Sequence, residues 1–498
     1  MATATYRISV DWDNDGTLQE IVFLTPWQFT SPGEYEDVTQ FVRARPGIRT
    51  ARGRDQIRAL APPMAGTADC ELDNQSKQFS PENASGALYG YLLPGRKLQI
   101  RAVYSGTTYY LFTGVLDDLP QHPARAERSV SLPSLGTLSR LAGKRISTAL
   151  YASIRTDVAL GYLLDAAGWP AADRVLDTGK TTLDWWWLQD EDAFDAAKTL
   201  LATEGPGAAL YEDGQGRIVF ESRHYRLTTA RSTASQATIS DTGSEPLFSG
   251  FAYNPGLKDI INVCEITTKT RAAQVASVVW TLGQTITLAA NEVRKYTVSA
   301  SDPFTGAIAP VNVTDYTLNS GTLASATLDR TSGESCTITL TAGASGAEVA
   351  DLQLRAQSVT TQATVIVANT ISAATSISNF GRQIYTDSVR AEIPLTVAQD
   401  LVNAVVGRYQ DPRPTVTLAI NNGADDRMTQ ILSREISDRV TVVEAQTGAN
   451  HGYWIERVEH SVDEAGLQHI ATMGCEKVIS AQYAVWGTAV WGTDQWGF

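Results

Sequence analysis

Short runs of alternating apolar and polar residues dominate the first part of the chain. Between residues 37 and 118 these runs are bounded by Pro-Gly, Ser-Gly and Asp-Asn pairs, which favour turns. Leu98 and Ile100, for example, fall on one face of such a run. An isolated hairpin cannot bury its apolar face, so short strands at this spacing must pair into a larger sheet. We therefore predict a small antiparallel β-barrel over residues 1–145.

A first strand pair is predicted at residues 6–10 and 21–23, joined by a short polar loop. Asp11, Asp13 and Asp15 place carboxylates at alternate positions before a glycine, as in the first half of a calcium loop. The second half does not fit, because the twelfth position is a valine where a bidentate glutamate is needed. Asn-Asp-Gly also suits a hairpin turn. We expect a turn and keep the three aspartates as candidates for a metal site.

The pattern changes to a helical period after Thr156, which we expect to cap a helix that ends at Gly168. A second helix is predicted from Asp190 to a Gly-Pro pair, followed by a hairpin over residues 208–220. Three adjacent tryptophans lie between the helices, at residues 185–187. Neighbours on a strand point to opposite faces, so packing or a subunit interface is favoured over a platform that stacks sugars.

Residues 275–369 differ from their surroundings. They are rich in Thr, Ser, Ala and Val, with a strand signal about every ten residues, which favours a seven-strand immunoglobulin-like sandwich. We predict that this sandwich is inserted into a second β-barrel that begins near residue 246 and resumes near Ser376. In that barrel, Thr396 is expected to cap a helix. Strands are predicted at residues 416–420, 439–443, 453–458 and 467–471.

Two of the five histidines lie close together in the last predicted hairpin. A four-residue turn between Val462 and Leu467 would set His460 directly opposite His469, on one face and within reach of a shared metal ion. No third ligand is evident, although Glu459 or His451 could approach. We favour a packing pair and keep the two histidines as candidates for a metal site.

The chain ends in a repeat of tryptophans at Trp486, Trp491 and Trp496. A period of five fits neither a helix stripe nor a strand alternation. We expect this tail, residues 479–498, to run extended and to bury its indoles against another subunit or a neighbouring protein.

Composition narrows the class of protein. The 498 residues are 43% hydrophobic and 19% charged, as in a soluble chain of several domains, and the net charge is -14. This charge argues against a protein that grips nucleic acid, but not against one that DNA slides past. One basic cluster stands out, and we favour a solvated or partner-facing strand and loop for it. As a functional role, contact with an acidic neighbouring subunit is favoured over direct contact with DNA. The cluster contains Arg43, Arg45, Arg49, Arg52, Arg54 and Arg58.

The sequence gives little support for catalysis or for a cysteine-based metal site. The four cysteines have no paired spacing, so buried thiols are expected rather than a zinc site or disulfides. Metalloprotease, serine-hydrolase and phosphate-loop motifs are missing, so we expect no enzyme and no cofactor. No apolar run is long enough to span a bilayer, and the first residues lack a secretory pattern, so folding in a cytoplasm is expected.

Six motifs, in order over about eighty residues, carry a family resemblance. They are Asp37-Val38-Thr39, Ala61-Pro62-Pro63-Met64-Ala65-Gly66-Thr67, Leu72-Asp73-Asn74, Phe79-Ser80-Pro81-Glu82-Asn83, Leu93-Pro94-Gly95-Arg96 and Leu111-Phe112-Thr113-Gly114-Val115-Leu116-Asp117-Asp118. This succession resembles the amino-terminal region of minor tail proteins of long-tailed bacteriophages, the hub or tail-tip proteins that cap the tail tube. The later helix–Pro–strand order resembles the same family.

The resemblance implies a mainly β fold with an α+β part, built from two barrels that resemble the tail-tube subunit. The domains expected are a first barrel at 1–145, an α+β domain at 146–235, a second barrel at 236–274 and 370–478, the insert at 275–369 and the tail. A homotrimer would then present six barrels to a six-fold tube, at the tail tip of a virion assembled in the host cytoplasm. The partners implied are other tail proteins: a tube or distal tail protein, a tape measure, and fibre or receptor-binding proteins, with DNA only in transit. The alternative is a tail protein that binds host cell-wall glycan.

Overall fold

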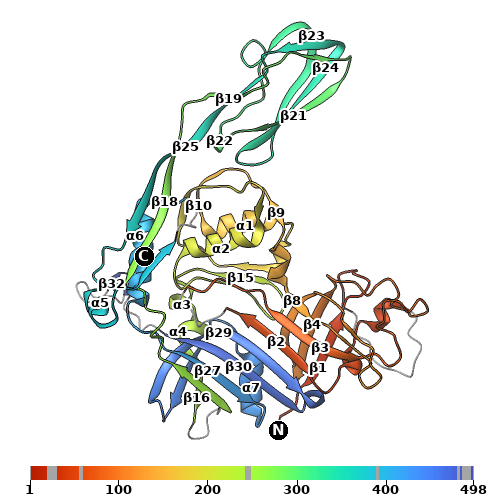
Figure 1. Ribbon diagram of the computed structural model, residues 1–498, viewed down its shortest axis with the longest axis vertical. Coiled ribbons are helices and arrows are strands. Elements are labelled where there is room, and N and C mark those ends of the chain that lie inside the picture. Colours follow the sequence, from red (N-terminus) through yellow and green to blue (C-terminus); the bar gives the residue numbers. More distant parts are fainter. Residues whose placement is uncertain are drawn as a thin grey trace.

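The structure is a computed structural model that describes residues 2–18, 31–54, 60–241, 248–387, 392–478, 483–484 and 495–496. A broad β-rich base carries a smaller unit that contains α1 (Thr156–Ala166) and α2 (Ala193–Glu204), and a long β arm projects beyond that unit (Figure 1). Strands far outnumber helices, so the predicted mainly β class with an α+β part is confirmed. No helix in these ranges combines the length and the apolarity that crossing a bilayer requires.

The first β half of the base follows the predicted alternation. It contains β1 (Thr5–Val10), β2 (Ile48–Gly53), β3 (Thr67–Asp73), β4 (Lys97–Tyr104), β5 (Thr107–Leu116), β6 (Gln121–His122), β7 (Ser129–Ser131) and β8 (Ser134–Gly136). Leu98 and Ile100 of β4 are both buried. Ser105 and Gly106 join β4 to β5, and their positive φ angles of 49° and 78° suit a tight type I′ hairpin. β1 pairs with β4, whereas its predicted partner, residues 21–23, lies outside the described residues.

The second β half joins the first along one edge. It contains β16 (Ser235–Ser240), β17 (Gly250–Asn254), β27 (Thr415–Asn421), β28 (Arg439–Glu444), β29 (Ala449–Asp463) and β30 (Gln468–Lys477), with the helix α7 (Asp425–Ser433). β2 pairs antiparallel with β29, from Ile48 opposite Val462 to Gly53 opposite Arg457. The two halves therefore form a single 14-stranded sheet.

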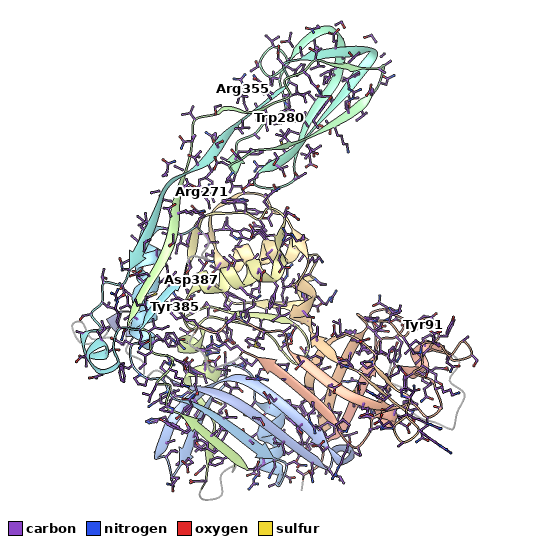
Figure 2. The ribbon with its side chains drawn as sticks, viewed as in Figure 1. Tyr91, Arg271, Trp280, Arg355, Tyr385 and Asp387 are labelled. Carbon is purple, nitrogen blue, oxygen red and sulfur yellow. The ribbon has the colours of Figure 1, made fainter. Side chains whose placement is uncertain are left out.

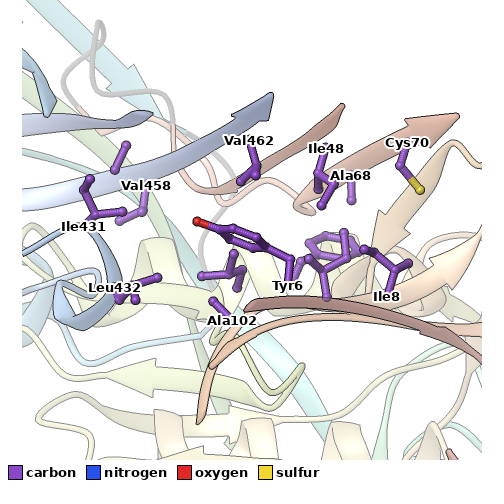
Figure 3. Packing of buried hydrophobic residues seen from close by; sticks show 14 of the residues in the cluster. Tyr6, Ile8, Ile48, Ala68, Cys70, Ala102, Ile431, Leu432, Val458 and Val462 are labelled. Atoms are coloured by element: carbon purple, nitrogen blue, oxygen red, sulfur yellow. The ribbon is translucent and has the colours of Figure 1, made fainter. Parts of the chain in front are cut away.

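We predicted two separate closed barrels, and these are not found among the described strands. The main path of paired strands runs from β1 at one end to β17 at the other. The reason lies in β2, whose two edges are occupied by β3 and by β29, so β2 cannot also pair with β1 to close the first half. The sheet curves instead, and apolar side chains fill the space between its layers. Figure 3 shows Tyr6 and Ile8 of β1 facing Ile48 of β2 and Val462 of β29.

The α+β unit, which lies between the halves in the sequence, contains two long helices, two helices of a single turn and small sheets. Its elements are β9 (Arg145–Ile146), β10 (Tyr151–Arg155), α1 (Thr156–Ala166), β11 (Arg174–Leu176), β12 (Thr182–Trp186), β13 (Glu191–Asp192), α2 (Ala193–Glu204), β14 (Ala209–Glu212), β15 (Ile218–Glu221), α3 (Tyr225–Thr228) and α4 (Ala230–Thr233). The hairpin predicted at residues 208–220 is β14–β15. Two further helices, α5 (Ala374–Phe380) and α6 (Leu395–Tyr409), come from the later part of the chain.

Helix starts differ from the predicted caps. Thr156 is the first residue of α1, and its hydroxyl donates to Glu204 at 2.6 Å instead of capping. α2 begins later than predicted, because the carboxylate of Asp192 accepts the amides of Phe194 and Asp195, each at 3.0 Å. α6 starts after Pro394, which places Thr396 inside its first turn.

The segment after β18 (Val263–Ala273) forms the arm, which we define as residues 275–357. Seven strands lie between residues 275 and 369, the number predicted, and they form two sheets: β19 (Ser277–Thr281), β20 (Ile286–Leu288), β21 (Val293–Ser299), β22 (Phe304–Thr305), β23 (Thr317–Arg330), β24 (Ser335–Ala350) and β25 (Gln353–Ala368). β25 continues past the arm along β18, so that Ala368 lies opposite Glu265. The two ends that lie together are Gln274 and Ser358, whose backbone groups are 2.8 Å apart. The immunoglobulin-like topology and the domain boundaries stay predictions.

Within the part of the chain that the structure describes, buried apolar side chains form three clusters. The first fills both β halves, the second joins the α+β unit to α6 and β18, and the third lies wholly within the arm. All four cysteines are buried and unpaired, as predicted.

Candidate functional site, a buried charged junction

Charged side chains gather where the sheet, the α+β unit and α6 meet. We name this group the charged junction: Arg54, Glu221, Arg226, Arg408, Glu456 and Glu476. None of these side chains is more than 16% exposed. Burying a charge is costly unless an opposite charge and hydrogen bonds replace water, so the contacts within the group decide whether it stabilises the fold.

Glu456 lies at the centre of the charged junction. A β-bulge in β29 between Ile455 and Arg457 takes it out of the strand's alternation, so it is buried. Its carboxylate accepts hydrogen bonds from both terminal nitrogens of Arg226, one at 3.1 Å, and from Nε of Arg54 at 2.7 Å. Burial would raise the pKa of Glu456, but the charges of Arg226 and Arg54 outweigh it and hold the pKa well below its usual value.

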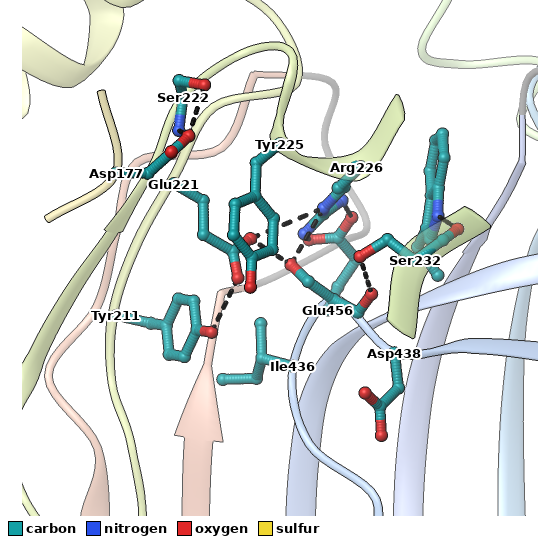
Figure 4. A network of polar contacts seen from close by, with 12 residues as sticks. Asp177, Tyr211, Glu221, Ser222, Tyr225, Arg226, Ser232, Ile436, Asp438 and Glu456 are labelled. Carbon is teal, nitrogen blue, oxygen red and sulfur yellow. Dashed lines mark hydrogen bonds and ion pairs between the residues drawn. The ribbon is translucent and has the colours of Figure 1, made fainter. Parts of the chain in front are cut away.

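Glu221, the last residue of β15, lies on the other side of Arg226. Its carboxylate accepts hydrogen bonds from the Tyr211 hydroxyl at 2.8 Å and from the Ser437 hydroxyl, while Nε of Arg226 lies 4.0 Å away (Figure 4). Burial raises the pKa of Glu221, against the opposing effect of Arg226. These contacts join the α+β unit to the second β half.

Glu476 on β30 extends the network to α6. Its carboxylate lies 3.0 Å from Nε of Arg413, 3.2 Å from Arg408 and 3.7 Å from Arg54. The guanidinium groups of Arg226 and Arg408 lie over the ring of Trp454, 5.7 and 5.9 Å from its centre. Both arginines are thus held by a carboxylate and an aromatic face.

Arg52 and Glu212 make a second buried link. Arg52 donates to the carbonyls of Leu111 at 2.9 Å and Glu212 at 3.2 Å, and it pairs with Glu435 at 3.0 Å. The carboxylate of Glu212 accepts the amide of Leu138 at 2.8 Å, and burial raises its pKa. A Cβ at Gly136 would lie 1.5 Å from that carboxylate, so only glycine fits there.

The geometry of the charged junction supports a structural role for these residues. The side chains of Glu221 and Glu456 are each 1% exposed, so a substrate cannot reach them. Each charge instead connects segments that are far apart in the sequence. The junction therefore fastens both β halves and the α+β unit into one body.

Comparison with known proteins returns tail proteins. No protein-family model and no curated protein matches this sequence. The prophage MuSo2 43 kDa tail protein from Shewanella oneidensis is 11% identical at a TM-score of 0.46, over 95% of this chain and 98% of that one. A tail protein from Neisseria meningitidis MC58 is 10% identical at 0.49, over 95% and 96%. Prophage tail protein gp18 from Listeria monocytogenes EGD-e is 8% identical at 0.42, over 95% and 94%.

The arginine cluster is brought into contact with acidic residues of this chain. Arg43 pairs with Glu71 at 3.0 Å and Arg49 with Asp463 at 2.7 Å. Arg52 and Arg54 belong to the buried networks above, and Arg58 lies outside the described residues. The acidic partner expected in a neighbouring subunit is therefore supplied within the chain for four of the arginines. An interface role for Arg43, Arg45 and Arg49 stays a prediction.

His460 and His469 meet, although not in the predicted register. Ala465 and Gly466 take positive φ angles of 56° and 92° and place the turn one residue later, so His460 lies opposite Ala471. The two rings are diagonal neighbours, and Nδ1 of His460 lies 3.0 Å from Nε2 of His469. Nδ1 of His469 is 2.7 Å from the Tyr6 hydroxyl, so both its nitrogens are engaged in hydrogen bonds. Burial lowers the pKa of His469 to about 3.

The remaining candidates are the aspartates of the first loop and the tryptophans of the tail, and the structure describes only some of them. Asp11, Asp13 and Asp15 each have a carboxylate oxygen within 4.8 Å of the others and of Glu36, and the Asp11 carboxylate also accepts turn amides. A metal site there and at the histidines stays a prediction. Trp486 and Trp491 lie outside the described residues; Trp496 belongs to β32 (Gln495–Trp496), which pairs with β31 (Tyr483–Ala484).

Sequence reasoning missed the centre of the charged junction. Arg226 and Glu456 are 230 positions apart, and nothing in a local pattern pairs them. One signal was present: Glu456 interrupts the apolar run Tyr453 to Ile455 within a predicted strand, where a charge must find a partner.

Proposed function

We propose that this chain is a structural protein of a phage virion, a tail-tip hub that caps the tail tube and forms part of the path for DNA. Six ordered motifs in the first 118 residues support the assignment to the tail-tip family. The observation that carries the proposal is the pairing of β2 with β29, which joins two β halves edge to edge in one chain.

This joining suits a ring. Three copies of a chain with two fixed β halves offer six β units around an axis, which matches the symmetry of a six-fold tube. The charged junction supports the ring because it fixes the angle between the halves. Within this proposal each half takes the place of one tail-tube subunit, and the partners are the tube or distal tail protein, the tape measure and the fibre proteins.

The same proposal includes no catalytic role. The carboxylates of Glu221 and Glu456 in the charged junction are closed to solvent, as described above. A net charge of -14 suits a wall that DNA passes without binding, because acidic side chains repel phosphate. We expect assembly in the host cytoplasm and residence at the tail tip.

The mass of the purified protein in solution tests the ring. Sedimentation analysis should give a closed trimer of about 161 kDa, three times the chain mass of 53.8 kDa. A species of 53.8 kDa at every concentration, together with failure to bind purified tail tubes, would count against the hub.

A second candidate function is binding of host cell-wall glycan by the arm. The projection of the arm beyond the body favours it, because its far end is free of the rest of the chain (Figure 1). Binding of the whole protein to host cell walls, compared with a protein lacking residues 275–357, separates the two functions. Binding that depends on the arm, with no change in trimer mass, would add recognition to the hub.

A further inference from the structure

We propose that the arm is a movable element, held in one position by a polar latch and able to pivot at a narrow neck. The proposal rests on the contacts of the arm itself and holds whether or not the protein is a tail-tip hub. Figure 2 shows Arg271 between the body and the arm, with Trp280 and Arg355 further out.

The neck is the part of the β18–β25 ribbon where Thr361–Thr364 runs beside Lys269–Arg271. All four residues from Thr361 to Thr364 are exposed, so the β25 strand of the ribbon is uncovered there. A β-bulge interrupts the pairing between Thr270 and Arg271. A two-stranded ribbon with one strand uncovered bends easily, and a bulge adds a local bend, so the ribbon is least stiff at this point.

The arm shares no buried apolar cluster with the body. Every member of its own cluster comes from residues 279–356, and no residue of 275–357 belongs to the other two clusters. The arm can therefore change its angle to the body without opening an apolar core, whose exposure is the main cost of most rearrangements.

The latch lies at the near end of the arm, where the turn between β23 and β24 meets the body. The amide of Gly333 donates to the carbonyl of Thr148 at 2.8 Å. The indole N–H of Trp187 donates to the carboxylate of Glu334 at 3.0 Å, and the Ser332 hydroxyl donates to Gln189. A Cβ at Gly333 would lie 2.7 Å from Trp187, so the close approach depends on glycine.

Arg271 completes the latch from the neck. Its guanidinium lies 3.1 Å from Glu392 of the body and 3.6 Å from Asp302 of the arm, over the ring of Trp187 at 5.0 Å from the centre. The side chain is 10% exposed. One cation thus bridges the two parts beside the Trp187–Glu334 hydrogen bond. All of these bonds are polar, so water can replace each of them when the arm moves away.

Distance measurements on the full-length protein test the proposal. Cysteines placed at exposed Ala172 on the body and Ser320 on the arm can carry spin labels selectively, because the four native cysteines are buried. The otherwise unchanged protein should show one narrow distance distribution. Arg271→Met with Glu334→Ala should add a broad population at other distances, and the Gly333 amide should exchange at least about tenfold faster.

Two controls make the outcome decisive. In the first control, Glu334→Gln takes the place of Glu334→Ala in the double variant. The glutamine keeps an acceptor for the Trp187 indole, so the narrow distance distribution should return. Glu292→Ala removes a partly exposed carboxylate of the arm that pairs with Arg294, away from the latch and from the label at Ser320, and should change nothing. An unchanged distribution in the double variant overturns the latch. So does rapid exchange of the Ile338 and Leu340 amides, because the contacts would then hold the fold of the arm rather than its position.

Discussion

Removing one charge from the centre of the charged junction should be far more costly than removing a surface charge. Arg226→Met keeps much of the side chain's volume but takes the guanidinium away from Glu456, which is 1% exposed. Arg54 alone then faces the carboxylate. Breaking a buried pair from one side costs about 3–5 kcal/mol, because the remaining charge stays buried without sufficient compensation.

The matched control is Arg145→Met. Arg145 pairs with Asp190 at 3.2 Å, but the two side chains are 58% and 71% exposed. Water and salt screen such a pair, so its loss should cost less than about 1 kcal/mol. Urea unfolding of both variants, followed by circular dichroism, gives the free energy of unfolding relative to the unchanged protein.

A second variant separates the lost charge from lost packing. Arg226→Met combined with Glu456→Gln removes the buried carboxylate that is left with Arg54 alone, and it should recover part of the stability lost by Arg226→Met. If Arg226→Met costs no more than Arg145→Met, the charged junction does not hold the units together and the reasoning fails.

Four further predictions concern other parts of the chain. Gly136→Ala should lose more than about 2 kcal/mol of stability, since its Cβ would displace the buried Glu212 carboxylate, whereas Gly161→Ala on α1 has room and should be neutral or stabilising in the same unfolding assay. Between pH 6.5 and pH 3, His469 is protonated in the unfolded chain but not in the folded chain, where its pKa is lowered to about 3. The free energy of unfolding should therefore fall as the pH drops through this window, and it should fall less steeply in His469→Asn. An equal slope in both proteins would contradict the assignment. Joining Gln274 to Ser358 through a short Gly-Ser bridge should leave a folded, assembling protein, and an aggregated product would show that the arm belongs to the ring. Truncation after Val478 should leave the melting temperature nearly unchanged but weaken incorporation into particles, and equal incorporation would refute an anchoring role for the tryptophans.

Local patterns predicted the helices and strands because the order of apolar and polar residues within each element determines which of its side chains are buried. The apolar residues Leu401, Val402, Val405 and Val406 recur at helical spacing in α6, and all four are buried. The alternation of Leu98 and Ile100 likewise gave the buried face of β4. Seven strands were predicted between residues 275 and 369 from their spacing, and seven are present.

Strand partners and the candidate site could not be predicted in this way. Nothing in the run Ile48 to Gly53 says that its second neighbour is β29, some four hundred residues later, and that pairing is what prevents a closed first barrel. The charged junction depends on the same long-range pairing, since Glu456 reaches Arg226 only when β29 carries it there. The register of the histidines depended on two left-handed residues in a turn, where a shift of one position moves every pair.

The central claim is a ring of this chain at the tip of a phage tail. Electron cryomicroscopy of purified particles tests it most directly, with the arm deletion from Gln274 to Ser358 as a marker for the position of the chain. The account predicts threefold density at the tail tip, with three projecting arms in the unchanged particle that are missing in the deletion. Density for this chain elsewhere in the particle, or at the tip without threefold symmetry, would contradict it.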